Sequence, residues 1–121
     1  QEEASPKPLV RLGEELKTPP LSKDARIEAG HLLRRLQQGE TLGMPHSRPM
    51  PGIVPRCHEL RIRDENRTWR VVYRIDDEAI VIASVFSKST PTTSKRDIEV
   101  CKARLKRYDR NAQAAEGGTN G

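Results

Sequence analysis

The chain has 121 residues, which is enough for one domain and too few for two. Apolar residues make up 34% of it, and no run approaches the roughly 18 that a membrane span requires, so the composition excludes a membrane protein and predicts a cytoplasmic one. Of the 22 Lys and Arg residues, 15 lie in residues 43–110 against 9 of the 17 acidic residues, a surplus that favours contact with a polyanion.

Residues 1–7 are polar, and we expect them to be disordered. Residues 8–13 predict a short edge strand. Residues 13–17 can form one helical turn, which ends at Pro19 because proline cannot continue a helix.

A longer helix is predicted over residues 23–38. Ser22 is a good N-cap, and Gly39 is a natural residue to follow the end of the helix. Between them, apolar residues recur at helical spacing, namely Ala25, Ala29, Leu32, Leu33 and Leu36. Ile27 points away from this stripe, and we expect it to be exposed.

Residues 40–56 contain four prolines and two glycines and predict a loop. Three strands are expected next, over residues 57–63, 67–75 and 79–87. The turns between them are short enough to make an antiparallel meander. The third strand is apolar on both faces, which is typical of a central strand covered on both sides.

Thr93 or Ser94 is predicted to cap a last helix, with Asp97 as the capping-box partner, and residues 109–121 are expected to form a disordered tail. The element order predicts an α+β fold with two N-terminal helices, a curled antiparallel sheet of three to four strands and a C-terminal helix. We expect the helices to bury one sheet face. The other face would stay partly open, with the arginines of the strands alternating onto it.

The two cysteines, Cys57 and Cys101, stand apart, which is typical of reduced thiols. The three histidines lack metal-ligand spacing, so we expect neither a metal site nor a cofactor. Aromatic residues are only 3% of the chain, which argues against a base-stacking platform. Ordinary solubilising charge is the alternative explanation of the basic segment.

Motifs in the second half of the chain resemble the HigB-type toxins of the RelE/HigB superfamily, in their phage-derived branch. The motifs are HELRIRD at 58–64, WRVVY at 69–73, VFSK at 85–88 and KRDIE at 95–99. The resemblance covers residues 8–108, and the order and spacing of the motifs together make it specific. In this sequence Ser89 stands where the family pattern has a second lysine, and Ser94 stands where it has a proline.

The resemblance implies a RelE-like fold over residues 8–108 and the toxin half of a type II toxin–antitoxin pair. Such a toxin is an endoribonuclease that cleaves mRNA, often on the ribosome, and so inhibits translation and growth. The implied partner is an antitoxin with a helix-turn-helix domain. Because Ser89 removes one expected phosphate contact, the alternative is a catalytically weak binding module that acts through its antitoxin, operator DNA or the ribosome.

Cleavage of RNA through its own 2′-hydroxyl needs a proton acceptor, a group that stabilises the phosphorane and a proton donor for the leaving oxygen. Arginine suits the second task, because its guanidinium pairs bidentately with phosphate. Together with the motif order, this predicts three catalytic residues: Arg61, Arg70 and Lys88. Further RNA contacts are predicted at Arg63, Arg48, Phe86 and Lys95.

The alternative for the strand arginines is solvation, or pairing with Glu59. Tyr73 lies three residues from Arg70 along one strand and therefore belongs on the opposite face, where core packing is expected. His58 shares the side of Leu60, which favours a structural histidine. His46 and Arg48 lie in the loop beside the expected site. The sequence offers no clear general base.

Overall fold

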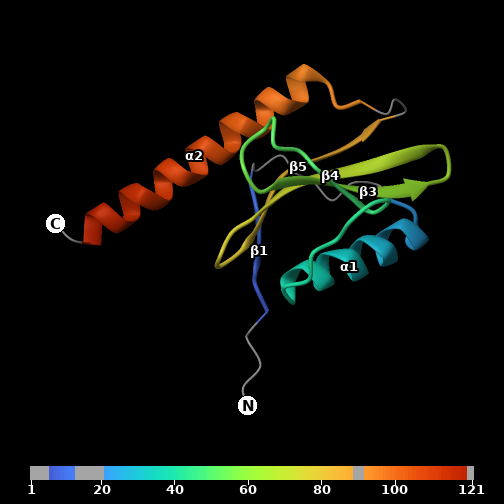
Figure 1. Cartoon of the computed structure of the whole chain (residues 1–121), viewed down its shortest axis with the longest axis horizontal. Coiled ribbons are helices and arrows are strands. Elements are labelled where there is room, and N and C mark those ends of the chain that lie inside the picture. The colour runs from blue at the N-terminus through green and yellow to red at the C-terminus, as the bar shows by residue number, and fades with distance from the viewer. Residues whose placement is uncertain (1–5, 13–20, 89–91, 120–121) are drawn as a thin grey trace, which may run out of the picture.

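Five strands form one mixed sheet, and one helix covers each of its faces (Figure 1). The computed structural model describes residues 6–12, 21–88 and 92–119. In chain order the elements are β1 (Leu9–Arg11), α1 (Lys23–Gln37), β2 (Ser47–Pro49), β3 (Cys57–Asp64), β4 (Arg67–Ile75), β5 (Ile80–Lys88) and α2 (Lys95–Thr119). Within the described ranges, neither helix has the length and apolar content needed to cross a membrane.

The strand order in the sheet is β1-β5-β4-β3-β2. β3, β4 and β5 make the predicted antiparallel meander. β1 lies at the edge, as predicted, but it runs parallel to β5, with Leu9 opposite Ile80. The expected antiparallel sheet of three to four strands is therefore wrong, because the sheet has five strands and mixed direction.

The fifth strand, β2, lies in the segment predicted as a loop. It pairs antiparallel with β3 and places Pro49 opposite His58. Beside β2, the Met50 amide donates to the Cys57 carbonyl, and the His46 carbonyl accepts from the Arg61 amide. Pro49 lies between these bonded positions, where the backbone nitrogen faces away from β3, so the lack of an N–H costs no hydrogen bond to β3. Proline is tolerated there because an edge strand has no partner on that side.

The two helices lie on opposite faces of the sheet, so the expectation that both cover one face is wrong. The physical reason is visible in β5, where Ile80 and Ile82 face one side while Val81 and Ala83 face the other. Both faces are apolar, and each must be covered to exclude water. The structure describes one helix before the sheet rather than two. The helical turn predicted at 13–17 lies outside the described residues.

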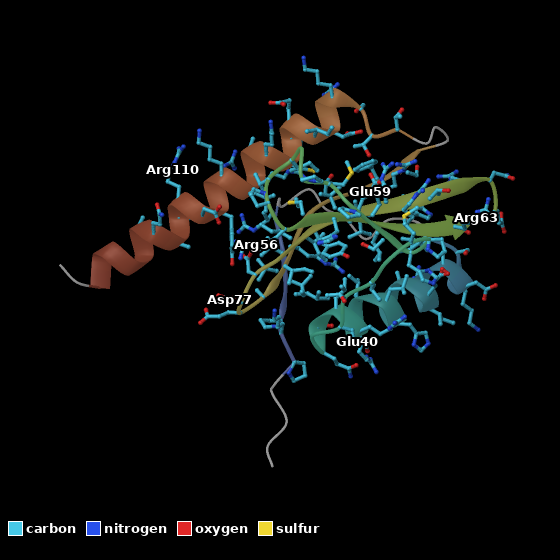
Figure 2. The ribbon with its side chains drawn as sticks, in the orientation of Figure 1. Glu40, Arg56, Glu59, Arg63, Asp77 and Arg110 are labelled. Carbon is cyan, nitrogen blue, oxygen red and sulfur yellow. The ribbon has the colours of Figure 1, made fainter. Side chains whose placement is uncertain are left out.

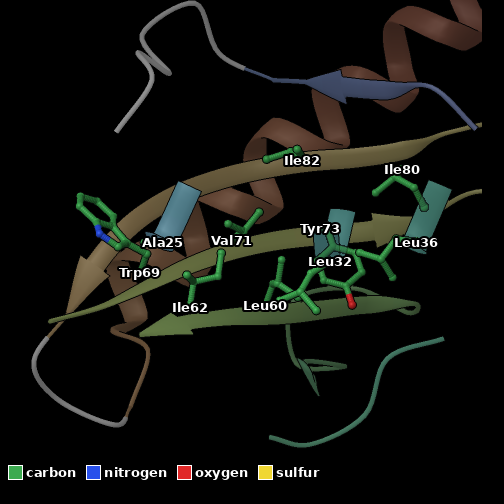
Figure 3. Close-up of a cluster of buried hydrophobic side chains, with 10 residues drawn as sticks. All are labelled: Ala25, Leu32, Leu36, Leu60, Ile62, Trp69, Val71, Tyr73, Ile80 and Ile82. Carbon is green, nitrogen blue, oxygen red and sulfur yellow. The ribbon is translucent and has the colours of Figure 1, made fainter. Parts of the chain in front are cut away.

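α1 covers the first face and its cluster of buried side chains (Figure 3). The helix contributes Ala25, Leu32 and Leu36, which confirms the predicted apolar stripe. The sheet contributes Leu60, Ile62, Trp69, Val71, Tyr73, Ile80 and Ile82. Ile27 is exposed, as predicted.

The ends of α1 follow from capping chemistry. The Ser22 hydroxyl accepts a hydrogen bond from the Ala25 amide at 3.2 Å, and Gly39 adopts a φ of +92°, which favours glycine. Asp64, at the end of β3, accepts hydrogen bonds from the Ser22 amide at 2.9 Å and from the Trp69 indole at 3.0 Å. One carboxylate therefore joins the start of α1 to the β3–β4 hairpin.

α2 covers the second face, against a cluster that includes two free cysteines, Cys57 of β3 and Cys101 of α2. Burial raises the pKa of the Cys101 thiol to about 12. The helix begins as predicted, with the Ser94 hydroxyl accepting from the Asp97 amide at 3.1 Å and donating to the Asp97 carboxylate at 2.8 Å.

α2 continues past Asp109, where its end was expected, as far as Thr119. Residues 110–114 are exposed, and their alanines and glutamine extend the helix by propensity rather than by burial. Of residues 1–7, which were predicted to be disordered, residues 1–5 lie outside the part of the chain that the structure describes. Lys7 itself is held by Gln37, whose carbonyl accepts from the Lys7 amide at 2.8 Å.

Arg74 fixes α2 to the sheet. Its buried guanidinium donates to Asp76 at 2.7 and 2.9 Å and to Asp109 of α2 at 2.9 and 2.7 Å. These hydrogen bonds lower the pKa of Asp109 and raise that of Arg74. Charge-assisted bonds of this kind are the strong ones, so Asp109 determines where the second half of α2 lies.

We predict that Asp109→Asn lowers the free energy of unfolding by about 1 kcal/mol, because it weakens two charge-assisted bonds whose acceptor is partly exposed to solvent. Urea unfolding followed by circular dichroism measures the change. Glu99→Gln, an exposed acid-to-amide change on the same helix, is the matched control. An equal effect of the two substitutions would show that the Arg74 contact does not hold the helix.

The lowered pKa of Asp64 predicts that the fold loses stability in acid. The Ser22 backbone hydrogen bond is the main cause that lowers the pKa of Asp64 from 3.8 to about 2. A lowered folded-state pKa stabilises the fold fully above pH 3.8, and this contribution is lost as the pH falls toward 2. Wild type should therefore exceed Asp64→Asn in stability at neutral pH, and urea unfolding should show the difference shrinking below pH 3.8. Asp77→Asn, in the β4–β5 turn, is the control that should show no such convergence.

Candidate functional site

The strand register brings the predicted site residues of the meander into two neighbouring rows across the sheet. The first row is Arg61 on β3, Arg70 on β4 and Phe86 on β5. The second row is Arg63, Thr68 and Lys88. Directly paired residues share a face of a sheet, as do residues two apart along a strand, so both rows lie on the face that α2 partly covers.

Beside the first row lies a buried carboxylate, Glu59 of β3, near the centre of the molecule (Figure 2). Its exposed fraction is 0%. One oxygen accepts from Arg70 at 2.9 Å and from Arg48 of β2 at 3.1 Å, and the other accepts from the Thr93 hydroxyl. The side chain of Glu59 thus connects β2, β4 and the segment that leads into α2.

This network divides the predicted cations into buried and accessible ones. Arg70 is 1% exposed and is held against Glu59, and about a third of the Arg48 side chain reaches solvent. Arg61 is half-buried, whereas Arg63 and Lys95 are exposed. Among the predicted cations whose side chains the structure describes, the accessible charge therefore comes from Arg61, Arg63, Lys95 and part of Arg48, whereas Arg70 is buried.

The two remaining predicted residues are on β5. Phe86 is half-buried and packs against the apolar cluster under α2. Lys88 ends β5 in register with Thr68, and its side chain lies outside the described part of the structure.

A hollow of about 420 Å³ opens beside these cations, between α1, the chain before β2 and the end of β3. It is lined by Glu28, Pro45, His46, Arg61, Arg63 and Thr68. The Arg61 amide donates to the His46 carbonyl at 2.8 Å, which fixes His46 as the lateral neighbour of Arg61. The hollow therefore combines an imidazole, a group that can serve as a general base, with two guanidinium groups.

The sequence placed His46 near the site but assigned it no role. Its position depends on the pairing of β2 with β3, which brings the residues just before Ser47 alongside Arg61. The only sequence signal is its distance of two residues from Arg48, and that spacing has meaning only once the strand is known.

Tyr73 and His58 lie on the other face, as predicted. The Tyr73 hydroxyl bonds the Ser47 hydroxyl at 2.6 Å inside the cluster under α1. His58 stacks on the Tyr73 ring with centroids 5.4 Å apart, and burial lowers its pKa. Neither residue lines the hollow beside Arg61 and Arg63. Among the described residues, no group of three His, Cys, Asp or Glu side chains is arranged to hold a metal ion.

The buried network predicts a large effect of a small change at Glu59. Glu59→Gln leaves Arg70 and Arg48 without their shared counter-charge, and breaking a buried ion pair in this way costs about 3 kcal/mol. The double variant Glu59→Leu/Arg70→Met removes both buried charges and should be more stable than Glu59→Gln. Urea unfolding of both proteins tests this, and a Glu59→Gln protein as stable as wild type would contradict the role of the carboxylate.

Comparison with known proteins gives one finding. Residues 14–106 match the model of the family described as "Phage derived protein Gp49-like (DUF891)". No curated protein matches the chain. The matched range runs from before α1 into α2 and includes every element that builds the hollow and the two rows.

Proposed function

The chain belongs to the Gp49-like family of phage-derived proteins, which is related to the toxins of toxin–antitoxin pairs, and we propose that it is an endoribonuclease toxin that cleaves mRNA. The observation that carries the proposal is the hollow in which His46 lies beside Arg61 and Arg63. A proton acceptor next to two phosphate-binding groups meets the chemical needs of RNA cleavage through the 2′-hydroxyl.

In the proposed reaction, the His46 imidazole accepts the proton of the 2′-hydroxyl, and the 2′-oxygen attacks the adjacent phosphorus. Arg61 stabilises the charge of the pentavalent phosphorane, because guanidinium binds two phosphate oxygens at once. The bond to the 5′-oxygen then breaks, leaving a 2′,3′-cyclic phosphate, and the released oxygen takes a proton from water. Arg63, Lys95 and the exposed part of Arg48 bind the flanking phosphates.

Arg70 has a different proposed role, because it is buried against Glu59. It acts as a positioning residue: together with Arg48 it balances the charge of the Glu59 carboxylate, and it thereby helps to fix Arg48 beside the proposed site. Lys88 stays in the proposed catalytic set by its place in the row of Arg63. Phe86 stays as a contact for a base by its place beside Arg70.

The family relationship supports an antitoxin partner, and we propose that it is an adjacent-gene protein with a helix-turn-helix domain. The substrate is mRNA, on the ribosome, and the place of action is the cytoplasm. Loss of translated message would then stop growth until the antitoxin neutralises the toxin.

A second candidate is a binding module with weak or no cleavage, which acts through its antitoxin, operator DNA or the ribosome. The specific observation in its favour is that Arg48 and Arg70 are both bound to Glu59, and that Arg70 is buried from solvent. In this case the surface arginines would hold a nucleic acid without cutting it.

Primer extension on mRNA from cells that briefly express the chain separates these functions. Wild type should give discrete new 5′ ends. Arg61→Gln should reduce them by about 10²–10³-fold, as expected for loss of a group that stabilises transition-state charge. His46→Ala should reduce them by about 10²-fold or more, as expected for loss of a general base.

Arg34→Gln, an exposed arginine on α1, is the matched control and should cleave like wild type. Circular dichroism confirms that each variant is folded. Growth arrest with intact mRNA would support the binding module and contradict cleavage. Cleavage that persists in both Arg61→Gln and His46→Ala would overturn the proposed site.

A further inference from the structure

The outer side of α2 carries a dense set of basic side chains that the candidate site does not use. The set is Arg96, Lys102, Lys106, Arg107 and Arg110. All are exposed except Lys102, which is half-buried. Arg110 points away from the sheet (Figure 2).

The periodicity of the helix explains this arrangement. At 3.6 residues per turn, Arg96, Lys106, Arg107 and Arg110 point away from the core side of the helix, where Ile98, Cys101 and Leu105 pack against the sheet. Lys102 lies at the border between the two sides. The remaining basic residue of this stretch, Arg104, turns inward and donates to the Ala83 carbonyl at 2.9 Å. The outer face is therefore separate from the face that stabilises the fold.

The acidic residues of α2 whose side chains the structure describes, Asp97, Glu99 and Asp109, each have a contact of their own. Asp109 is bound to Arg74, and Asp97 is engaged by the cap at Ser94. Glu99 lies 3.7 Å from Lys102 and forms an ion pair with it on the outer side of the helix. Lys106, Arg107 and Arg110 have no acidic partner within 4.0 Å in the described structure.

We infer that the outer face of α2 binds the phosphate backbone of double-helical RNA, as an anchoring surface apart from the cleavage site. Lys102, Lys106 and Arg110 recur every four residues, so their charges follow one another about 6 Å apart along a straight rod. Binding to a phosphate backbone is largely electrostatic and needs this kind of repeated positive charge.

The composition of the face favours RNA over a protein partner. Stable protein interfaces bury aromatic or aliphatic side chains at their centre, and between Arg96 and Arg110 the outer face of α2 offers only Ala103 and the half-buried Val100. The absence of aromatic residues on this described face also favours a duplex over a single strand, whose binding depends on base stacking.

The anchoring surface lies away from the hollow. The bonds between Arg74 and Asp109 hold the Lys106–Arg110 turn near the β4–β5 turn, whereas Arg63 lies at the opposite end of the meander. The inference rests on the proposed function: a toxin that cuts mRNA would use this surface to attach to a structured RNA while its other face meets the message.

The test is fluorescence anisotropy with a labelled RNA duplex of about 20 base pairs and the full chain, repeated over a range of KCl concentrations. The variant is Lys106→Gln/Arg107→Gln/Arg110→Gln. Its matched control, Lys23→Gln/Arg26→Gln/Arg34→Gln, removes the same charge from exposed positions of α1. We expect the α2 substitutions to raise the Kd for the RNA duplex by roughly 10- to 100-fold. They should also reduce the slope of log K against log salt by an amount that corresponds to about three fewer released ions, and the control should change little.

Equal loss in the two triple variants would overturn the inference, because net charge rather than the α2 face would then be responsible. It would also fail if the α2 variant bound the duplex like wild type but lost binding to polyglutamate, which would indicate an acidic protein partner. The assay does not depend on cleavage. A chain that cuts no mRNA but loses duplex binding in the α2 variant would contradict the proposed function and uphold the anchoring surface.

Discussion

A carboxylate buried in a protein must be met by opposite charge, since leaving it unpaired costs several kcal/mol. Glu59 imposes this requirement at the middle of the sheet, and the groups that satisfy it come from three other parts of the chain. Arg70 lies on the neighbouring strand, Arg48 on the edge strand and Thr93 just before α2. A shift of β2 or β4 by one residue would move its arginine to the other face and leave the charge uncovered. The network therefore selects one register for the strands that form the candidate site.

The same face of the sheet serves two purposes, divided by where α2 lies. Under the helix, this face of the sheet is part of the hydrophobic core. The one arginine named there, Arg74, is bound to Asp109 of the helix. Beyond the helix the face is open and basic, with Arg61 and Arg63 at its surface. The helix itself is likewise two-sided, apolar toward the sheet and basic outward. Positive charge is thus kept at the surface in both places, where it can meet phosphate without the cost of burial.

Local rules predicted the elements well, because their signals are local. Ser22 and Gly39 bound α1, Ser94 starts α2, and alternation along β3 and β4 assigns Tyr73 to the core and Arg61 to the opposite face. The errors concern pairings between distant segments. Nothing near Leu9 indicates that it runs parallel to Ile80, and the prolines around residue 49 obscure an edge strand that exists only because β3 offers it a partner.

The candidate site was predictable in its residue types but only partly in its geometry. Arg61 and Arg63 are accessible, as the alternation suggested, whereas the burial of Arg70 depends on Glu59 and on the chain that covers it. The sequence named pairing with Glu59 as the alternative for a strand arginine, and this is what the structure places at Arg70. His46 reaches Arg61 through a β-ladder bond, which no spacing in the sequence reveals.

The chemical reactivity of the two buried cysteines reports on local opening of the fold. Cys57 belongs to the sheet and Cys101 to the helix above it, and burial suppresses the thiolate that a labelling reagent must attack. The Cys101 thiol can react when α2 lifts from the sheet or the whole domain opens, and Cys57 can also be exposed by movement of the segment around Ile53 that packs against it. Their labelling rates therefore measure the free energy of these openings, with no probe added to the protein. A ligand bound to the outer face of α2 that stabilises the helix on the sheet would therefore slow the labelling of Cys101 on its inner side.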